Sequence, residues 1–275
     1  VECPALDVTP LHSVTHYDRV FLTGATGFLG AFLLHELLRQ TQAKIYCLVR
    51  SLNEEEGRKR LRKTLESYSL WDEDLAARIL PVPGDLSQPL LGLSTERFDR
   101  LAQEIDVIYH NGAVVNFIYP YSALKTANVL GTQEVLRLAC RANVKPVHYI
   151  STLSVFDSDG HSKKHVISEH EHLNHSEGLY SGYAQSKWVA EKLVERACSR
   201  GLPVCIYRPG MITGHSQTGI WNTADLACSM IKGCIQMQSA PYQDVMVDMT
   251  PVDYVSKAIV HLSTQPTFLG KVFHL

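Results

Sequence analysis

The sequence predicts an α/β domain built on a doubly wound parallel sheet with helices on both faces. Short apolar runs rich in β-branched residues recur along the chain, and amphipathic helical stretches separate most of them. Continuous apolar strands are typical of parallel sheets, because these sheets are buried on both faces. The 275 residues, 45% of them hydrophobic, suffice for one large domain, alone or with a small appendage.

The expected elements follow in order along the chain. Strands are expected over residues 19–24, 43–49, 78–84, 106–112, 147–151 and 204–208. Amphipathic helices are expected over residues 28–40, 121–142 and 182–200. From Met211 the apolar pattern has a shorter period, with helices near 222–237 and 251–263 and a last strand at 271–275.

Composition narrows the classes of function. The formal net charge is −2, so no basic excess points to nucleic acid. No apolar run approaches the ~18 residues of a membrane helix, and no secretory signal segment is visible. The seven cysteines are scattered without a C-x-x-C pair, which favours buried thiols in a reducing, cytoplasmic setting.

A glycine-rich turn lies where the first strand is expected to become a helix. The stretch "RVFLTGATGFLG" places Gly24, Gly27 and Gly30 at intervals of three. Gly24 permits a tight turn, Gly27 lets a pyrophosphate approach the backbone, and Gly30 lets the helix pack closely. The helix N-terminus offers free N–H groups to the phosphates, so the pattern predicts a Rossmann-type dinucleotide site rather than an ordinary glycine-rich turn. The intervening residues that we assign to this site are Thr26, Phe28 and Leu29.

The end of the second strand predicts which dinucleotide is bound. About 20 positions beyond the last glycine, where an acidic residue would bind a free ribose 2′-hydroxyl, the chain has Arg50. An arginine there favours a 2′-phosphate, so we expect NADPH. Several basic residues follow on a helical stretch, and among them we choose Arg60 for a second contact with the phosphate. The alternative interpretation of these residues is a basic helix face exposed to solvent. Further cofactor contacts are expected in "GDL" and "HNGA", at Asp85, Leu86, Asn111, Gly112 and Ala113.

A tyrosine and a lysine share one helical face in "SGYAQSKWVAEKL". Tyr183 and Lys187 stand at i and i+4, and a nearby ammonium favours the phenolate. Tyr183 is therefore a candidate general acid for a carbonyl oxygen that accepts hydride, and Lys187 can hold the nicotinamide ribose. Thr152 follows the fifth strand, where a hydroxyl can reach a substrate oxygen. The alternative for Tyr183 and Lys187 is an ordinary surface pair.

Together these motifs resemble the extended short-chain dehydrogenase/reductases, and among them the thioester reductase domains that terminate nonribosomal peptide and polyketide synthases. Carboxylic acid reductases and aminoadipate reductases carry similar domains. The resemblance runs from about Arg19 to the end of the chain. It rests on "FLTGATGFLG", "CLVR", "GDL", "HNGAVVNF", "KTANVLGT", "YRPGMITG" and "TPVDYVSKAIVHLS".

The resemblance implies roles for particular residues. The implied catalytic residues are Thr152, Tyr183 and Lys187, with Asn128 supporting a proton-relay water. The implied cofactor contacts include Arg50 and Arg60 at the 2′-phosphate, Lys187, and Pro209 and Gly210 of "YRPG". The implied reaction is NADPH-dependent release of an acyl or peptidyl thioester from the phosphopantetheine arm of a carrier protein, as an aldehyde or, after a second hydride, an alcohol. The carrier is expected to be the preceding domain of the same synthase.

Two other functions stay open on the sequence. One is a sugar-nucleotide epimerase or ketone reductase of the same superfamily, although Arg50 argues against the NAD-dependent epimerases. The other is a non-catalytic NADPH-sensing module, which would not need Tyr183 and Lys187. We expect residues 1–210 to bind the cofactor and carry the catalytic groups. Residues 211–275 would form a small, truncated substrate lobe, with about 251–275 returning to the main sheet.

A histidine-rich segment precedes the tyrosine helix. Its histidines are His161, His165, His170, His172 and His175. Their spacing fits no regular zinc pattern, and no cysteine accompanies them. We therefore expect a polar loop and no metal site.

Overall fold

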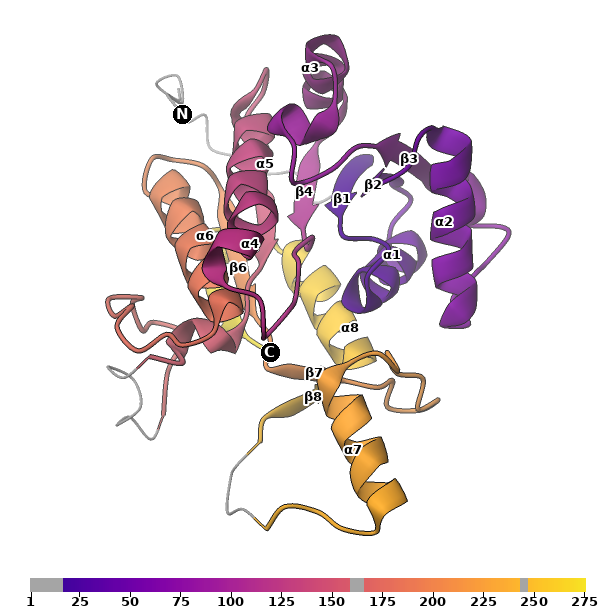
Figure 1. Ribbon diagram of the computed structural model, residues 1–275. Coiled ribbons are helices and arrows are strands. Elements are labelled where there is room, and N and C mark those ends of the chain that lie inside the picture. The colour runs from indigo at the N-terminus through magenta and orange to yellow at the C-terminus, as the bar shows by residue number, and fades with distance from the viewer. Residues whose placement is uncertain (1–16, 159–165, 243–246) are drawn as a thin grey trace.

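A parallel sheet organises the computed structural model, which describes residues 17–158, 166–242 and 247–275 (Figure 1). Within the described residues, seven strands pair in the order β3-β2-β1-β4-β5-β6-β9. Their bounds are β1 Arg19–Thr23, β2 Lys44–Val49, β3 Ile79–Pro83, β4 Val107–His110, β5 Val147–Ile150, β6 Val204–Arg208 and β9 Val272–His274. All the strands predicted from the sequence form, and each pairs in parallel with its neighbours.

Helices cover both faces of the sheet, so the doubly wound fold is confirmed. One face carries α1 (Phe28–Gln40), α2 (Glu54–Ser67) and α8 (Val252–Ser263), whose apolar side chains share one core. The other face carries α3 (Thr95–Glu104), α5 (Gly131–Cys140) and α6 (Gly182–Cys198), which share the second core. Every residue of β4, β5 and β6 is buried between these layers, which explains their continuous apolar runs.

The helix predicted over residues 121–142 is interrupted. It begins as α4 (Tyr121–Lys125), passes through a π-helical turn over Thr126–Leu130 and continues as α5. In the π turn the N–H of Gly131 donates to the carbonyl of Thr126, five residues back. The apolar period does not reveal such an extra residue, and π turns occur frequently at functional sites.

The chain after β6 leaves the main sheet and returns to it. β7 (Met211–Thr213) and β8 (Met249–Pro251), which the sequence did not predict, pair as a separate two-stranded sheet. Between them α7 (Leu226–Met237) starts after the N-cap Asp225, four residues later than expected. Afterwards α8 packs against α1, and β9 pairs with β6, as expected for residues 251–275. The division of the chain at residue 210 stays a prediction.

The edge strand β3 contains two prolines, Pro81 and Pro83. Between them Val82 is buried in the core beside β2. Beyond them the N–H of Gly84 donates to the carbonyl of Val49 on β2 at 3.0 Å. Because backbone groups alternate sides along a strand, positions 81 and 83 face away from β2 when position 84 faces it.

The remaining turns and side chains complete the description. Short 3₁₀ turns occupy Ala76–Arg78, Pro89–Gly92, Leu153–Phe156 and Pro266–Phe268. Among the described cysteines, all free thiols, Cys47 and Cys205 are buried and the others are partly buried. None of the described helices combines the length and apolarity needed to cross a bilayer.

Candidate active site

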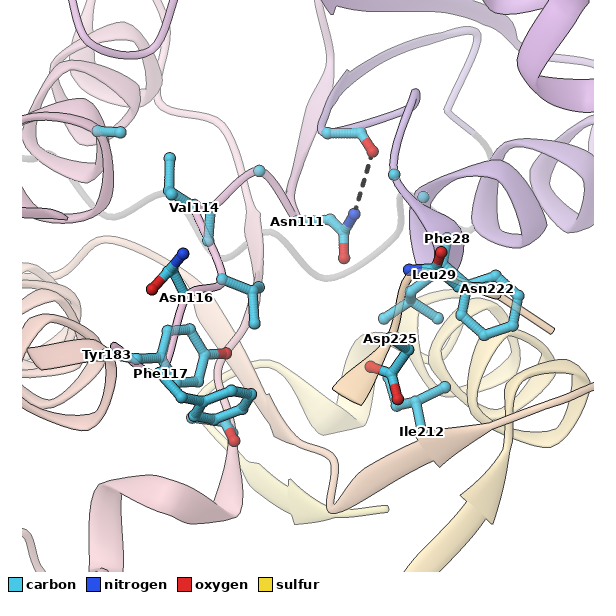
Figure 2. Close-up of a pocket in the computed structure, with 18 of the residues that line it drawn as sticks. Phe28, Leu29, Asn111, Val114, Asn116, Phe117, Tyr183, Ile212, Asn222 and Asp225 are labelled. Atoms are coloured by element: carbon cyan, nitrogen blue, oxygen red, sulfur yellow. Dashed lines mark hydrogen bonds between the residues drawn. The ribbon is translucent and has the colours of Figure 1, made fainter. Parts of the chain in front are cut away.

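A cavity of about 1400 Å³ opens at the carboxyl ends of β1 and β4. These two strands are neighbours, but the chain proceeds from β1 toward β2 on one side and from β4 toward β5 on the other. Ligands of doubly wound sheets bind at such a topological switch point. Figure 2 shows the cavity between two walls, with Tyr183 and Phe117 on one and Asp225 and Ile212 on the other.

The glycine turn lines this cavity. A side chain at each of its glycines would meet different surroundings. Gly24 has φ +75°, and an added Cβ would lie 2.7 Å from Gly112 Cα. At Gly30 an added Cβ would collide with the Gly24 carbonyl oxygen, so the protein itself requires both glycines. At Gly27 the nearest contact would be 3.3 Å away. The protein backbone therefore leaves room at Gly27, next to the cavity.

The N-terminus of α1 is open to a ligand. Its N-cap, Gly27, makes no side-chain capping bond, and the first turn holds no acidic residue. The first-turn residues Phe28 and Leu29, as well as Thr26, line the cavity. The N–H groups of a helix start that lack intrahelical partners bind anions readily.

Arg50 and Arg60 meet at the rim of the cavity. Both side chains are exposed and line it, and Arg60 Nη1 donates to the Arg50 carbonyl at 2.9 Å. Two of the neighbouring basic residues form ion pairs on α2 itself. Lys59 pairs with Glu55 at 2.6 Å and Arg62 with Glu66 at 2.7 Å. Lys59 and Arg62 of α2 thus lie in exposed ion pairs, whereas Arg60 lines the cavity.

Six more of the predicted cofactor contacts lie around the same opening. Asp85, Leu86, Asn111, Gly112, Ala113 and Gly210 all line the cavity. Asn111 Nδ2 donates to the Gly24 carbonyl at 3.4 Å, the dashed line of Figure 2, which joins the ends of β4 and β1. Asp85 Oδ1 accepts bonds from the N–H and the hydroxyl of Ser87 at 2.8 and 2.7 Å.

Tyr183 and Thr152 come together at the cavity wall. Burial raises the pKa of Tyr183 to about 12, while a hydrogen bond with Thr152 acts in the opposite direction. The phenol therefore keeps its proton at neutral pH and can donate it. The ring of Phe117 meets Tyr183 edge-on, with centroids 5.4 Å apart.

Lys187 behaves differently from the prediction. Its Nζ donates to the Ile150 carbonyl at 2.7 Å and lies 4.4 Å above the Tyr149 ring. Burial lowers the pKa of Lys187 to about 7, with Glu191 opposing the shift. The expectation that Lys187 lowers the pKa of Tyr183 was wrong for this state, because β5 holds the amine and desolvation raises the phenol pKa.

Two further predicted residues lie behind the cavity wall. Asn128, in the π turn, accepts a bond from the Val114 N–H at 2.7 Å. Its Nδ2 donates to the Val114 carbonyl and to Ser186 Oγ at 3.0 and 2.9 Å. The Pro209 carbonyl accepts a bond from the Leu153 N–H at 3.0 Å. In the described structure, neither Asn128 nor Pro209 nor Lys187 lines the cavity.

Sequence reasoning missed part of the lining. The loop after β4 exposes apolar side chains at Val115, Phe117 and Ile118, of which Ile118 is 91% exposed. The opposite wall comes from Asn222 and Asp225, which precede α7, from its first residue Leu226, and from Asp248. The Asp225 carboxylate accepts from the N–H groups of Ala227 and Cys228, an N-cap signal that was readable before the apolar run.

The histidine-rich segment forms a loop where it is described. His170, His172 and His175 lie outside helices and strands, whereas His161 and His165 lie outside the described residues. The described part of the chain contains no group of three side chains placed to hold a metal ion.

Comparisons with known proteins decide the family. A family model of NAD-binding domains, described as "Male sterility protein", matches residues 22–259. The crystal structure of the terminal R domain from the myxalamid PKS-NRPS pathway is 60% identical, with a TM-score of 0.93 over 96% of this chain and 67% of that one. The chain belongs to the terminal reductase domains of these synthases.

Other relatives of this reductase domain are parts of longer proteins. It is 53% identical to one component of the linear gramicidin synthase of Brevibacillus parabrevis, over 95% of this chain and 5% of that protein. It is 30% identical to a thiolation-reductase di-domain from an archaeal non-ribosomal peptide synthetase, with a TM-score of 0.79 over 94% of this chain and 56% of that one. The chain spans a small part of the curated relatives it matches.

The matching family model describes NAD-binding domains and therefore implies a nicotinamide cofactor, which the described residues fit. The reductase domain has an uncapped helix start, a glycine at which the backbone leaves room, and two arginines at the far rim of the same cavity. This donor set suits a pyrophosphate and a further anionic group.

Proposed function

We propose that this reductase domain reduces an acyl or peptidyl thioester and releases the chain from its carrier protein. NADPH would supply the hydride. The observation that carries the proposal is the pair of hydroxyls, Thr152 and Tyr183, on the wall of the cavity that the glycine turn also lines. Hydride addition to the thioester carbon moves the carbonyl π electrons to oxygen, which takes the Tyr183 proton. Collapse of the hemithioacetal breaks the C–S bond and gives an aldehyde and a thiol.

The chain's own groups would stabilise the developing oxyanion. Because burial keeps the pKa of Tyr183 at about 12, the phenol is a donor at neutral pH. Thr152 adds a second hydroxyl beside it, and preorganised donors at a developing anion are a large catalytic contribution. We propose that Lys187 binds the nicotinamide ribose, and that Asn128 supports a relay water while holding the loop at Val114.

The family supports the proposed carrier partner, and the cavity walls support the proposed chain division. A thiolation domain adjoins the reductase in one solved relative, which supports an acyl-phosphopantetheine carrier as the partner. Residues 1–210 would bind the cofactor and carry the catalytic groups. In residues 211–275, the part before the return to the sheet at about residue 251 would face the acyl chain, because Ile212, Asn222 and Asp225 line the wall opposite Tyr183. A second hydride transfer would give an alcohol.

The test of the chemistry is Tyr183→Phe, assayed with NADPH and an acyl-pantetheine thioester. Loss of the acid should lower turnover by about 10²–10⁴-fold while NADPH affinity stays unchanged. Tyr254→Phe is the matched control, because Tyr254 is exposed on α8 and lies outside the cavity lining. Parental turnover in Tyr183→Phe would reject it as the acid. Reduction of a ketone but not of a thioester by the parent would favour the superfamily alternative, and cofactor binding without turnover would favour a sensor.

The cofactor preference is tested separately by Arg50→Asp. We propose that Arg50 and Arg60 bind the 2′-phosphate, through charge-assisted hydrogen bonds worth about 1.5–3 kcal/mol each. The variant should lose at least tenfold in NADPH affinity and little in NADH affinity. Lys59→Gln, whose parent side chain pairs with Glu55, should change neither. Equal NADPH affinity in Arg50→Asp and the parent would contradict the assignment.

A further inference from the structure

A buried line of hydrogen bonds starts at the end of β4 and runs through His110. The N–H of Gly112 donates to Thr23 Oγ1 at 2.8 Å. Thr23 Oγ1 lies 2.8 Å from His110 Nδ1, and His110 Nε2 lies 2.9 Å from Thr132 Oγ1. Thr23 ends β1 and immediately precedes the glycine turn. Through Thr23, Nδ1 of His110 is therefore connected to the strand end that carries this turn.

The same line continues from Thr132 to the helix of the proposed acid. Thr132 Oγ1 donates to the Asn128 carbonyl at 2.6 Å. Asn128 Nδ2 donates to Ser186 Oγ at 2.9 Å, and Ser186 Oγ donates to the Tyr183 carbonyl at 2.8 Å. The line therefore connects the backbone beside the glycine turn to the backbone of Tyr183.

The direction of each bond fixes the protonation of the imidazole. Thr132 uses its proton on the Asn128 carbonyl, so its oxygen accepts from a His110 Nε2–H. Nδ1 then accepts the Thr23 hydroxyl proton, and Thr23 in turn accepts the Gly112 N–H. Only the neutral ring with its proton on Nε2 satisfies every partner. A protonated ring would donate at both nitrogens. Thr23 Oγ1 would then accept from both His110 and Gly112, and none of these groups would accept its own buried proton.

The surroundings favour that neutral form. Thr23, His110, Asn128, Thr132 and Ser186 are all at most 2% exposed. Burial and the Lys187 ammonium lower the pKa of His110 to about 3. The Tyr149 ring, which Lys187 overlies, packs against His110 with centroids 5.6 Å apart.

We propose that His110 is a positioning residue that holds the glycine turn and the Tyr183 helix in one register, as a neutral imidazole protonated on Nε2. The inference rests on the proposed function, because register affects turnover only if Tyr183 is the acid. His110 is absent from the cavity lining and acts through its two threonine partners.

The decisive variant pair is Thr132→Val and Thr132→Ser. Valine matches threonine in shape but removes the hydroxyl, which cuts the line between His110 and Asn128. Misplacement of the acid should lower kcat by about 10- to 100-fold, while NADPH affinity and the KM of the thioester change little. Thr132→Ser restores the hydroxyl and should recover most of the lost kcat.

A control separates positioning from simple loss of a buried hydrogen bond. Tyr109, the residue before His110 on β4, bonds to Ser263 Oγ at 2.6 Å on the opposite face of the sheet. Ser263→Ala should lower thermal stability as Thr132→Val does, but should leave kcat at the parental value. An equal fall of kcat in both variants would overturn the positioning role.

Nitrogen NMR of the imidazole gives a readout that needs no turnover. In the NADPH-bound protein, with His110→Gln used to assign the signals, the ring should show the Nε2–H tautomer and no titration between pH 5 and 8. An Nδ1–H tautomer, or an unchanged kcat in Thr132→Val, would overturn the role of His110 alone. Failure of the parent to reduce any thioester would instead overturn the proposed function.

Discussion

The central sheet and helix α7 use similar apolar side chains in opposite ways. Every residue of β4, β5 and β6 is buried. In α7 no described residue is buried, and its large apolar side chains are 41–71% exposed. These side chains are Leu226, Met230, Ile231, Ile235 and Met237.

The difference teaches that an apolar run predicts an element but not its partner. The strands bury their side chains because two helical layers exist to cover them. The described residues provide no comparable layer over α7, which stands apart from the sheet in Figure 1 and adjoins it through β7 and β8. An exposed apolar surface of this kind is typical of an interaction site. Equivalent mutations should therefore change the free energy of unfolding by different amounts in the two regions.

The largest expected effect on stability lies at the buried ion pair between β6 and α6. Arg208 on β6 donates to Glu191 on α6 at 2.8 Å, and both side chains are at most 1% exposed. Arg208→Met would leave the Glu191 carboxylate buried without its partner and should cost about 3–5 kcal/mol of unfolding free energy. Urea denaturation measures the loss.

The matched control for that pair is an exposed one. Arg141 binds Asp99 at 2.8 Å, with side chains 55% and 34% exposed. Arg141→Met should cost only about 0–1 kcal/mol, because water already solvates both groups. If the two variants were equally stable, the buried pair would not differ from a surface pair.

A pair of isoleucines compares the two regions directly. Ile259 on α8 is fully buried, whereas Ile235 on α7 is 71% exposed. Ile259→Ala should cost about 2–5 kcal/mol through lost burial and a cavity. Ile235→Ala should stay within about 0.5 kcal/mol of the parent. A similar loss at both positions, measured by denaturation of the isolated protein, would mean that α7 is covered.

The smallest expected effects on stability concern two helical glycines, and they have opposite signs. An added Cβ at Gly30 in α1 would press on the Gly24 carbonyl, whereas at Gly233 in α7 it would meet nothing within 4 Å. Gly30→Ala should destabilise by about 1–3 kcal/mol. Gly233→Ala should stabilise by about 0.5–1 kcal/mol, because alanine restricts the unfolded chain. Melting temperatures should shift in opposite directions, and a shift of the same sign would contradict the comparison.

The sequence predicted the parts that depend on local pattern. Arg50, Asp85 and Asn111 could be placed at one cavity because they follow strands of a parallel sheet, whose carboxyl ends share one edge. Gly24 and Gly30 were readable because their backbone contacts lie within one strand–turn–helix unit. The roles of these residues toward a ligand stay predictions.

What the sequence could not reveal depends on contacts between distant elements. The direction of Lys187 is set by the Ile150 carbonyl and the Tyr149 ring, which come from another strand. The wall at Asn222 and Asp225 depends on where α7 stands relative to the sheet. β7 and β8, three residues each, are too short for a strand period to appear.

The two prolines of β3 have a consequence for pairing between molecules at the sheet edge. An open sheet edge presents unpaired N–H groups on which a strand from another molecule can assemble. At positions 81 and 83, on the side turned away from β2, those donors are missing because proline has none. The outer border of the sheet thus resists edge-to-edge aggregation, although its strand is as apolar as its neighbours.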